Sequence, residues 1–184
     1  MAVPQRLALI GFRASGKSTL GPVLAGFLDW VFVDMDEELT RSFGDSIAAW
    51  VERFGWERFR HEEAQLLERL SRQTHIVVAT GGGVVESEIN RKRLQKDFFT
   101  VWLRCRLETL CHRLAMDDKT TAQRPSLTGR SVVQETAEVL QQRNPWYAAS
   151  AHLVLDVETL RLEDLARKIL QSYEVSADFD RTVS

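Results

Sequence analysis

A stretch near the start of the chain has the residue types and the spacing that bind phosphate. It runs from Gly11 to Thr19, with two glycines separated by four residues and then a lysine and a hydroxyl residue. An apolar run precedes it and a helical pattern follows, so backbone N–H groups of the loop and the helix N-terminus would converge on an anion. Lys17 would reach the β- and γ-phosphates of a nucleotide, and the Ser18 hydroxyl would ligate Mg²⁺. A flexible turn rich in glycine and serine is the simpler alternative.

Two aspartates follow the second apolar run of the chain. Residues 30–33 predict a buried strand, and Asp34 and Asp36 come directly after it. Because successive strand residues face opposite ways, these two carboxylates are expected to project to the same side. At the carboxyl end of a parallel strand they would support Mg²⁺ through water and orient or deprotonate a hydroxyl. Alternatively, Asp36 only caps the helix that begins at Glu37.

Two arginines lie on helical stripes that are otherwise apolar. In the helix predicted for residues 56–70, Glu63 falls on the apolar stripe and Arg60 lies one turn earlier. Because an unpaired buried charge is costly, the two form either a surface ion pair or a guanidinium held by Glu63 for an anionic substrate. In a later helix Arg143 continues the inward stripe beside Pro145, which we expect to kink or break the helix. Arg143 then either binds an anion or pairs with a core carboxylate.

Three consecutive glycines, at positions 81–83, follow a third predicted strand at residues 75–79. Glycines after a buried strand expose backbone N–H groups and let a ligand approach closely. A plain loop is the alternative, but it leaves the absence of side chains at all three positions unexplained.

A long polar segment interrupts the second half of the chain. From residue 115 to residue 130 the apolar periodicity stops, which predicts a loop. Loops of this length in compact domains are often lids over an active site. In a phosphoryl-transfer enzyme, Arg124 in such a lid would help to exclude water and to neutralise developing charge.

The elements that must position these residues alternate between strand and helix. Residues 98–103 and 152–157 predict a fourth and a fifth strand, and residues 160–170 predict a closing helix. This alternation predicts an α/β fold with a five-stranded parallel sheet flanked by helices on both faces. We expect one domain over residues 1–171 and a disordered polar tail over residues 172–184.

The composition of the chain is ordinary for a globular protein. Its 184 residues are 44% hydrophobic and 27% charged, and the net charge of −2 gives no reason to expect a nucleic-acid partner. No apolar run approaches the length that spans a bilayer, and the first strand begins too early for a signal peptide. Cys105 and Cys111 lack a redox or metal-ligand spacing. We therefore expect reduced cysteines, a cytoplasmic location, no membrane partner and a monomer.

A phosphate loop, a lid and several candidate anion-binding arginines are typical of a small-molecule kinase, and in this order they resemble the shikimate kinase family. The resemblance covers nearly all of the chain between residues 7 and 170. The phosphate loop alone is shared by many nucleotide-binding proteins, but the ordered set is far more specific. That set comprises Gly11 to Thr19, the pair Asp34 and Asp36, Arg60 with Glu63, the glycines at 81–83, Arg124 with Pro125, and Arg143 to Tyr147.

The resemblance implies a P-loop fold of the nucleoside-monophosphate-kinase type and transfer of the γ-phosphoryl group of ATP to the 3-hydroxyl of shikimate. Lys17 and Asp36 would be the catalytic residues, with Asp36 as candidate base. Mg²⁺ would be held by Ser18 directly and by Asp34 through water. Shikimate would be bound by Asp36, Arg60, Gly82 and Arg143, with Glu63 in support. ATP would be bound by Ala14, Ser15, Gly16, Lys17, Ser18 and Thr19, with Arg124 in the lid and Arg113 against adenine.

The chain departs from the family pattern in three places. Ala14 stands where many members have glycine, the segment before Arg124 is longer than usual, and Ser126 stands where leucine is commoner after Arg124 and Pro125. The alternatives are another small-molecule kinase of the same fold, such as a gluconate kinase, and a regulatory nucleotide-binding module. The first would need a different acceptor pocket, and the second would tolerate the loss of Lys17 or Asp36.

Overall fold

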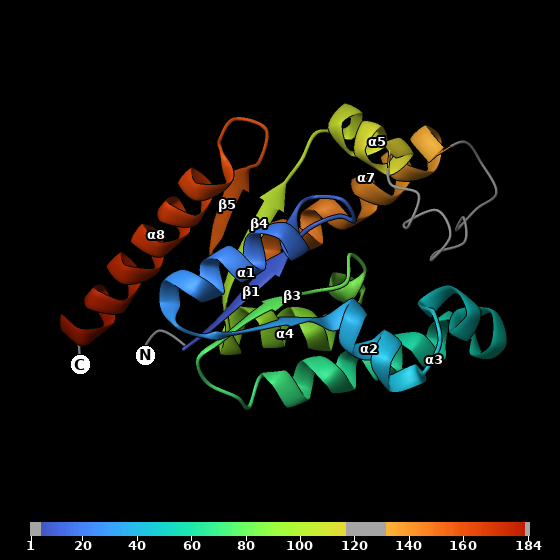
Figure 1. Ribbon diagram of the computed structural model, residues 1–184, viewed down its shortest axis with the longest axis horizontal. Coiled ribbons are helices and arrows are strands. Elements are labelled where there is room, and N and C mark those ends of the chain that lie inside the picture. Colours follow the sequence, from blue (N-terminus) through green and yellow to red (C-terminus); the bar gives the residue numbers. More distant parts are fainter. Residues whose placement is uncertain (1–4, 117–131, 183–184) are drawn as a thin grey trace.

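Five parallel strands form the centre of the protein, in the order β2-β3-β1-β4-β5 (Figure 1). The computed structural model describes residues 5–116 and 132–182. The strands are β1 (Arg6–Ile10), β2 (Val31–Asp34), β3 (Ile76–Ala79), β4 (Phe99–Arg104) and β5 (Leu153–Asp156). The predicted α/β fold with a five-stranded parallel sheet is confirmed. Because all strands run the same way, the loops after their carboxyl ends gather at one edge of the sheet.

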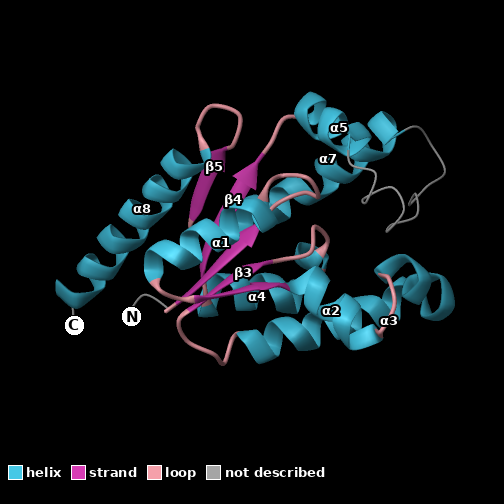
Figure 2. Cartoon of the chain, in the orientation of Figure 1, coloured by secondary structure: helices cyan, strands magenta, loops and turns pink. Residues whose placement is uncertain are grey.

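Helices cover both faces of this sheet (Figure 2). The helices are α1 (Lys17–Leu28), α2 (Met35–Phe43), α3 (Ile47–Leu70), α4 (Glu88–Asp97), α5 (Leu107–Met116), α7 (Val132–Ser150) and α8 (Leu162–Thr182), with a short 3₁₀ helix, η1 (Val84–Glu86). Strand β1 shows why both faces are covered, because its residues alternate between two cores. Leu7 and Leu9 pack with α1 and α8, whereas Ala8 and Ile10 pack with α2, α3, α4 and α7. None of the helices within the described ranges is long and apolar enough to cross a membrane.

Helix α3 consists of two segments with a break between them. Gly55 has φ 83° and ψ 163°, so the helical path is interrupted there. The helix predicted for residues 56–70 is the second segment, and Ser46 caps the first by accepting a hydrogen bond from the N–H of Ala49. This second segment carries Arg60 and Glu63 toward the sheet.

Helix α8 is longer than the sequence pattern suggested. It continues to Thr182, so the prediction of a disordered tail is wrong for residues 172–182. Tyr173 contributes to this difference, because it lies just beyond residues 160–170, over which the apolar pattern predicted the closing helix. Its ring packs edge-on against Trp30, at 5.7 Å between ring centroids, and against Phe99, at 5.5 Å. Tyr173 therefore anchors the first turn of α8 that lies beyond the predicted end.

Candidate active site

The loop between β1 and α1 is shaped by its backbone. Gly11 and Gly16 have φ values of 141° and 99°, and Ala14 has φ 61°. A side chain at Gly11 would place its Cβ atom 2.7 Å from the carbonyl oxygen of Leu103, which excludes any other residue there. The loop therefore turns back ahead of α1, whose N-terminus favours an anion.

Lys17 lies buried over this loop. Its Nζ atom donates to the carbonyl oxygen of Gly11 at 2.9 Å and to that of Phe12 at 2.8 Å. A third contact, at 3.3 Å, joins Nζ to the Oγ atom of Ser15. The ammonium group is thus held within the phosphate loop, where a bound anion would meet a fixed positive charge.

Ser18 and Asp34 bring two oxygen atoms together beside the loop. The Ser18 hydroxyl donates to Oδ2 of Asp34 at 2.5 Å. Within the described residues no group of three or more histidine, cysteine, aspartate or glutamate side chains could hold a metal by itself. Mg²⁺ uses hard oxygen ligands and is often held by one or two protein groups together with phosphate and water. Ser18 and Asp34 are therefore a suitable partial ligand set.

The two aspartates do not lie on one face of a strand, so that expectation is wrong. Strand β2 ends at Asp34, and Asp36 lies in the first turn of α2. Oδ1 of Asp34 accepts hydrogen bonds from the backbone N–H groups of Asp36, at 2.9 Å, and Glu37, at 3.4 Å. Asp34 rather than Asp36 therefore caps the helix, because a carboxylate satisfies N–H groups that lack a partner in the first turn. Asp36 therefore does not serve as the N-cap of α2.

A cleft of about 940 Å³ runs along the phosphate loop. It is lined by every predicted nucleotide residue from Ala14 to Thr19, and also by Asp34, Asp36, Gly82 and Arg113. Its far part is apolar, with Leu103, Val157, Leu160 and Leu162 in the wall. Arg113 is fixed by a 3.0 Å hydrogen bond from Nη1 to the carbonyl oxygen of Ala14. The cleft thus combines a phosphate-binding end with an apolar region suited to a flat ring.

Arg60 and Glu63 form an ion pair with a buried carboxylate and a partly exposed guanidinium, which differs from the exposed surface pair that was one of the two interpretations. Nη1 of Arg60 donates to Oε2 of Glu63 at 2.8 Å, and the Glu63 side chain is only 1% exposed. The guanidinium also lies over the ring of Trp56, 5.4 Å from its centroid. Burial alone would lower the pKa of Arg60, but the carboxylates of Glu63 and Glu86 raise it above its ordinary value. The arginine is therefore held permanently charged inside the protein.

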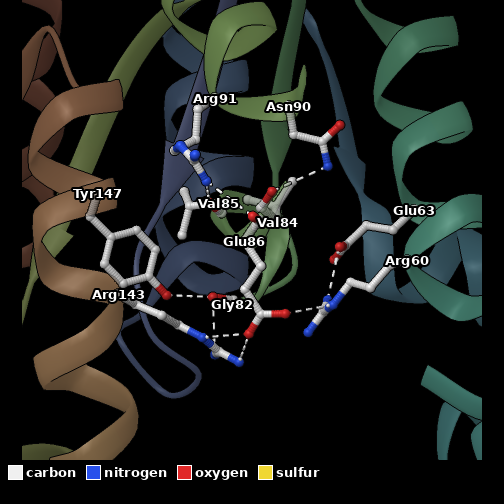
Figure 3. Close-up of polar contacts among 10 residues, drawn as sticks. All are labelled: Arg60, Glu63, Gly82, Val84, Val85, Glu86, Asn90, Arg91, Arg143 and Tyr147. Atoms are coloured by element: carbon white, nitrogen blue, oxygen red, sulfur yellow. Dashed lines mark hydrogen bonds and ion pairs between the residues drawn. The ribbon is translucent and has the colours of Figure 1, made fainter. Parts of the chain in front are cut away.

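Arg143 reaches the same place from helix α7, as Figure 3 shows. Its Nε and Nη2 atoms both donate to Oε1 of Glu86, at 2.9 and 2.5 Å, and Nη1 donates to the carbonyl oxygen of Gly82 at 3.2 Å. The hydroxyl of Tyr147 donates to the same carbonyl oxygen, and burial raises the pKa of this hydroxyl to about 12. Arg143 and Tyr147 are one turn apart on either side of Pro145, and α7 continues through the proline to Ser150. Of the expected kink or break at Pro145, the break is therefore not present, and Arg143 and Tyr147 on either side of the proline both donate to the carbonyl oxygen of Gly82.

The three glycines leave room for charged groups of the site. A Cβ atom on Gly83 would lie 2.0 Å from Nη2 of Arg60. On Gly81 it would lie 2.5 Å from Oε1 of Glu63 and 3.0 Å from Oδ1 of Asp36. Side chains at Gly81 and Gly83 would therefore displace the carboxylates and the guanidinium that α2 and α3 bring against this loop, whereas a Cβ atom on Gly82 would lie 3.1 Å from the backbone nitrogen of Arg13.

The structure places most of the predicted site residues along the cleft, with two exceptions. Arg124 and nearly all of the predicted lid lie outside the described residues. Arg60 and Arg143 do not line the cleft, and the link between this arginine pair and the cleft runs through Gly82.

Glu86 was not found by sequence reasoning. It forms ion pairs with both arginines, and its Oε2 atom lies 2.9 Å from Nε of Arg60. A usable signal existed: two inward arginines were predicted with only Glu63 as a partner, and Glu86 is the acidic residue three positions after the glycines.

Comparison with known proteins gives a consistent result. The family model described as shikimate kinase matches residues 13–174. The chain is 44% identical over 150 residues to a shikimate kinase of Nitratidesulfovibrio vulgaris, covering 82% of this chain and 85% of that protein. It is 39% identical over 166 residues to shikimate kinase 2 of Yersinia enterocolitica, covering 90% and 94%. The solved structure of shikimate kinase from Acinetobacter baumannii in complex with shikimate superposes with a TM-score of 0.84, at 32% identity over 92% of each chain.

Proposed function

Because the chain belongs to the shikimate kinase family, we propose that it transfers the γ-phosphoryl group of ATP to the 3-hydroxyl of shikimate, giving shikimate 3-phosphate and ADP. One observation carries the choice of acceptor. Two guanidinium groups, from Arg60 and Arg143, converge beside Gly82, which lines the phosphate-loop cleft. Shikimate has one carboxylate and several hydroxyls, so it needs cationic donors at one end and polar groups at the other.

The nucleotide would bind in the cleft with its phosphates on the loop from Ala14 to Thr19. Lys17 would face the β- and γ-phosphates, where it neutralises charge that develops as the phosphoryl group leaves ADP. Arg113 and the apolar wall at Leu103 and Leu160 would hold the base. Ser18 and Asp34 would hold Mg²⁺, which would supply positive charge to offset the negative charge of the phosphates.

The acceptor would bind between Asp36 and the arginine pair. Arg60 and Arg143 would bind its carboxylate, Glu63 would keep Arg60 in place, and the backbone of Gly82 would contact the ring. Asp36 would accept a hydrogen bond from the 3-hydroxyl and take its proton as the oxygen attacks the γ-phosphorus. The new bond joins the 3-oxygen to phosphorus, and the broken bond frees ADP.

We also propose that the protein acts as a cytoplasmic monomer. Cys105 and Cys111 are both free thiols, which agrees with a reducing compartment.

A coupled assay of ADP release tests the reaction. With ATP and Mg²⁺ present, ADP should form in proportion to added shikimate. Gluconate is the matched acceptor control, because it also has a carboxylate and hydroxyls but no ring. Turnover with gluconate and none with shikimate would overturn the acceptor assignment, and turnover with neither would overturn the reaction class.

A further inference from the structure

The carboxylate of Glu86 lies between the two guanidinium groups of the site (Figure 3). Its Oε2 atom is 2.9 Å from Nε of Arg60, and its Oε1 atom is 2.5 Å from Nη2 of Arg143. These are the contacts that the proposed function assigns to the carboxylate of the acceptor. Glu86 therefore already makes, from within the chain, the interaction for which the arginine pair is required.

We propose that Glu86 is an internal competitor that occupies the arginine pair until the acceptor carboxylate displaces it, and that it thereby sets the affinity of the site for anionic acceptors. This inference rests on the proposed function in one respect, namely that the acceptor carries a carboxylate. It assigns Glu86 a specificity-determining role that is separate from the chemical step.

The balance of charge supports displacement rather than addition. Two guanidinium groups, of Arg60 and Arg143, face two carboxylates, of Glu63 and Glu86. Asp36 contributes a further carboxyl group beside Glu63, since both approach Gly81. A carboxylate that entered while Glu86 stayed would add negative charge to a cluster in which carboxyl groups already outnumber guanidinium groups, and neighbouring like charges repel. Replacing Glu86 leaves the charge of the cluster unchanged.

Exposure separates the two glutamates. The Glu63 side chain is 1% exposed, whereas that of Glu86 is 36% exposed, the most of the four groups. Moving Glu63 away from Arg60 would leave a charge buried without its partner, which is strongly unfavourable. Glu86 can instead turn toward water, where its carboxylate is solvated. Glu63 is therefore suited to be the fixed support of Arg60 and Glu86 to be the replaceable partner.

The backbone around Glu86 is held independently of its side chain. Nη1 of Arg91 donates to the carbonyl oxygens of Val85, at 2.6 Å, and Glu86, at 3.0 Å. Nδ2 of Asn90 donates to the carbonyl oxygen of Val84 at 3.1 Å. Helix α4 thus fixes the 3₁₀ turn η1 in place. Displacement of Glu86 requires only rotation of its side chain, and loss of its carboxylate should leave the turn intact.

Glu86→Gln tests the proposal, because it removes the charge and keeps the shape. Glutamine binds the two guanidinium groups more weakly than the Glu86 carboxylate does, so the shikimate carboxylate should displace it more easily. We expect the KM for shikimate to fall roughly tenfold, with the KM for ATP unchanged. Glu88→Gln is the matched control, since Glu88 is an exposed glutamate two positions away that pairs only with Lys92 among the ion pairs described. Glu86→Ala is a second variant that removes the whole side chain, and circular dichroism checks that each variant is folded.

Binding of a simple probe separates this inference from the proposed reaction. Cyclohex-1-ene-1-carboxylate has the ring and carboxylate of the acceptor without its hydroxyls, and calorimetry measures its binding without turnover. It should bind roughly tenfold tighter to Glu86→Gln than to the wild type or to Glu88→Gln. Absence of shikimate turnover would overturn the proposed function, while the comparison of probe affinities would still decide on Glu86.

The direction in which the shikimate KM and the probe dissociation constant change decides whether Glu86 is a competitor. A rise in the shikimate KM and in the probe dissociation constant for both Glu86 variants would mean that Glu86 only positions the arginines. Equal values in Glu86→Gln and Glu88→Gln would mean that it has no part in binding. Either result overturns the proposal.

Discussion

The phosphate loop places its groups through the backbone of consecutive residues, whereas the arginine pair is placed by side chains from distant parts of the chain. Lys17 is hydrogen-bonded to carbonyl oxygens five and six positions away. Arg143 and its partner Glu86 are 57 positions apart, and Arg60 comes from a third element, α3. The first region is therefore shaped locally, while the second exists only after β3, α3, α4 and α7 have packed.

This difference affects which substitutions each region can accept without loss of the fold. Phosphate loops bind the same phosphates in many proteins, so local backbone geometry is sufficient for them. The arginine pair depends on buried charges whose partners must all be present, because removal of one leaves another unpaired. Substrate specificity is therefore expected to reside in the second region.

The largest expected effect is at the phosphate loop. Lys17→Ala removes the cation that would face the transferred phosphoryl group, and single cations in that role contribute about 10³–10⁵-fold in turnover. We expect kcat in the coupled assay to fall by about 10³-fold or more, with the melting temperature as a control for folding. A folded variant with near wild-type turnover would contradict the assignment of this loop to ATP.

Asp36→Asn tests the junction of the two regions. It keeps the shape of the side chain and removes the base, and general-base help is typically about 10²–10⁴-fold. We expect kcat to fall by that factor while ATP affinity, measured by calorimetry, changes little. The opposite pattern, with weak ATP binding and retained turnover, would place Asp36 in the metal site instead.

Arg143→Lys tests the second region alone. It keeps the charge but loses the planar fork that bonds Glu86 and Gly82 together. A charge-assisted contact contributes about 1.5–3 kcal/mol, so the KM for shikimate should rise roughly tenfold to a hundredfold, with much less change in the KM for ATP. Arg60→Lys should behave in the same way.

An acceptor analogue without the carboxylate is the control for both arginine variants. It should bind the wild type poorly, and the variants should lose little further affinity for it. Equal losses of affinity for shikimate and for the analogue would mean that these arginines are structural. Substrate specificity would then not reside in the arginine pair.

The same division explains what could be predicted from the sequence. The five parallel strands and their alternation with helices follow from local patterns, and this part of the fold was predicted correctly. Asp36 was assigned to a strand because the pattern of alternation was extended past Asp34, where the N-cap preference of aspartate starts a helix instead. The two arginines were found as anomalies on apolar stripes, which is a property of single helices.

Glu86 was missed because patterns within single elements do not show its partners, although the shortage of acidic partners for the two arginines was a usable signal. Glu86 ends the short turn η1 after two buried valines, and the packing of α3 and α7 on η1 brings two guanidinium groups to it. The close approach that requires glycine at positions 81 and 83 is equally a property of packing. Likewise, Tyr173 of α8 contacts Trp30, between α1 and β2, and Phe99 of β4. Such contacts with other elements cannot be read from the apolar pattern of one helix.

The smallest expected effect concerns a region that belongs to neither end of the site. At the start of β4 the N–H of Thr100 donates to Nδ1 of His152 at 3.0 Å, and the N–H of His152 donates to the carbonyl oxygen of Thr100 at 2.8 Å. Burial lowers the pKa of His152 below its ordinary value, because the charged ring is disfavoured there. Protonation at Nδ1 would also break the first of these hydrogen bonds.

The sign of the resulting pH dependence follows from linkage. The unfolded chain binds a proton at His152 near pH 6.5, whereas the folded chain resists it to a lower pH. The stabilising contribution is therefore complete above about pH 6.5 and is lost as the pH falls through the lowered pKa of the folded state.

We expect the urea midpoint of the wild type to be lower at pH 5.5 than at pH 7.5. In His152→Asn, whose side-chain oxygen still accepts a hydrogen bond but does not titrate, the decrease should be smaller. At pH 7.5 the KM values for ATP and shikimate should match those of the wild type, because β4 and β5 bind neither substrate at this edge. An equal decrease in both proteins would assign the pH dependence to other groups, and a changed KM would show that the sheet transmits strain from this edge to the site.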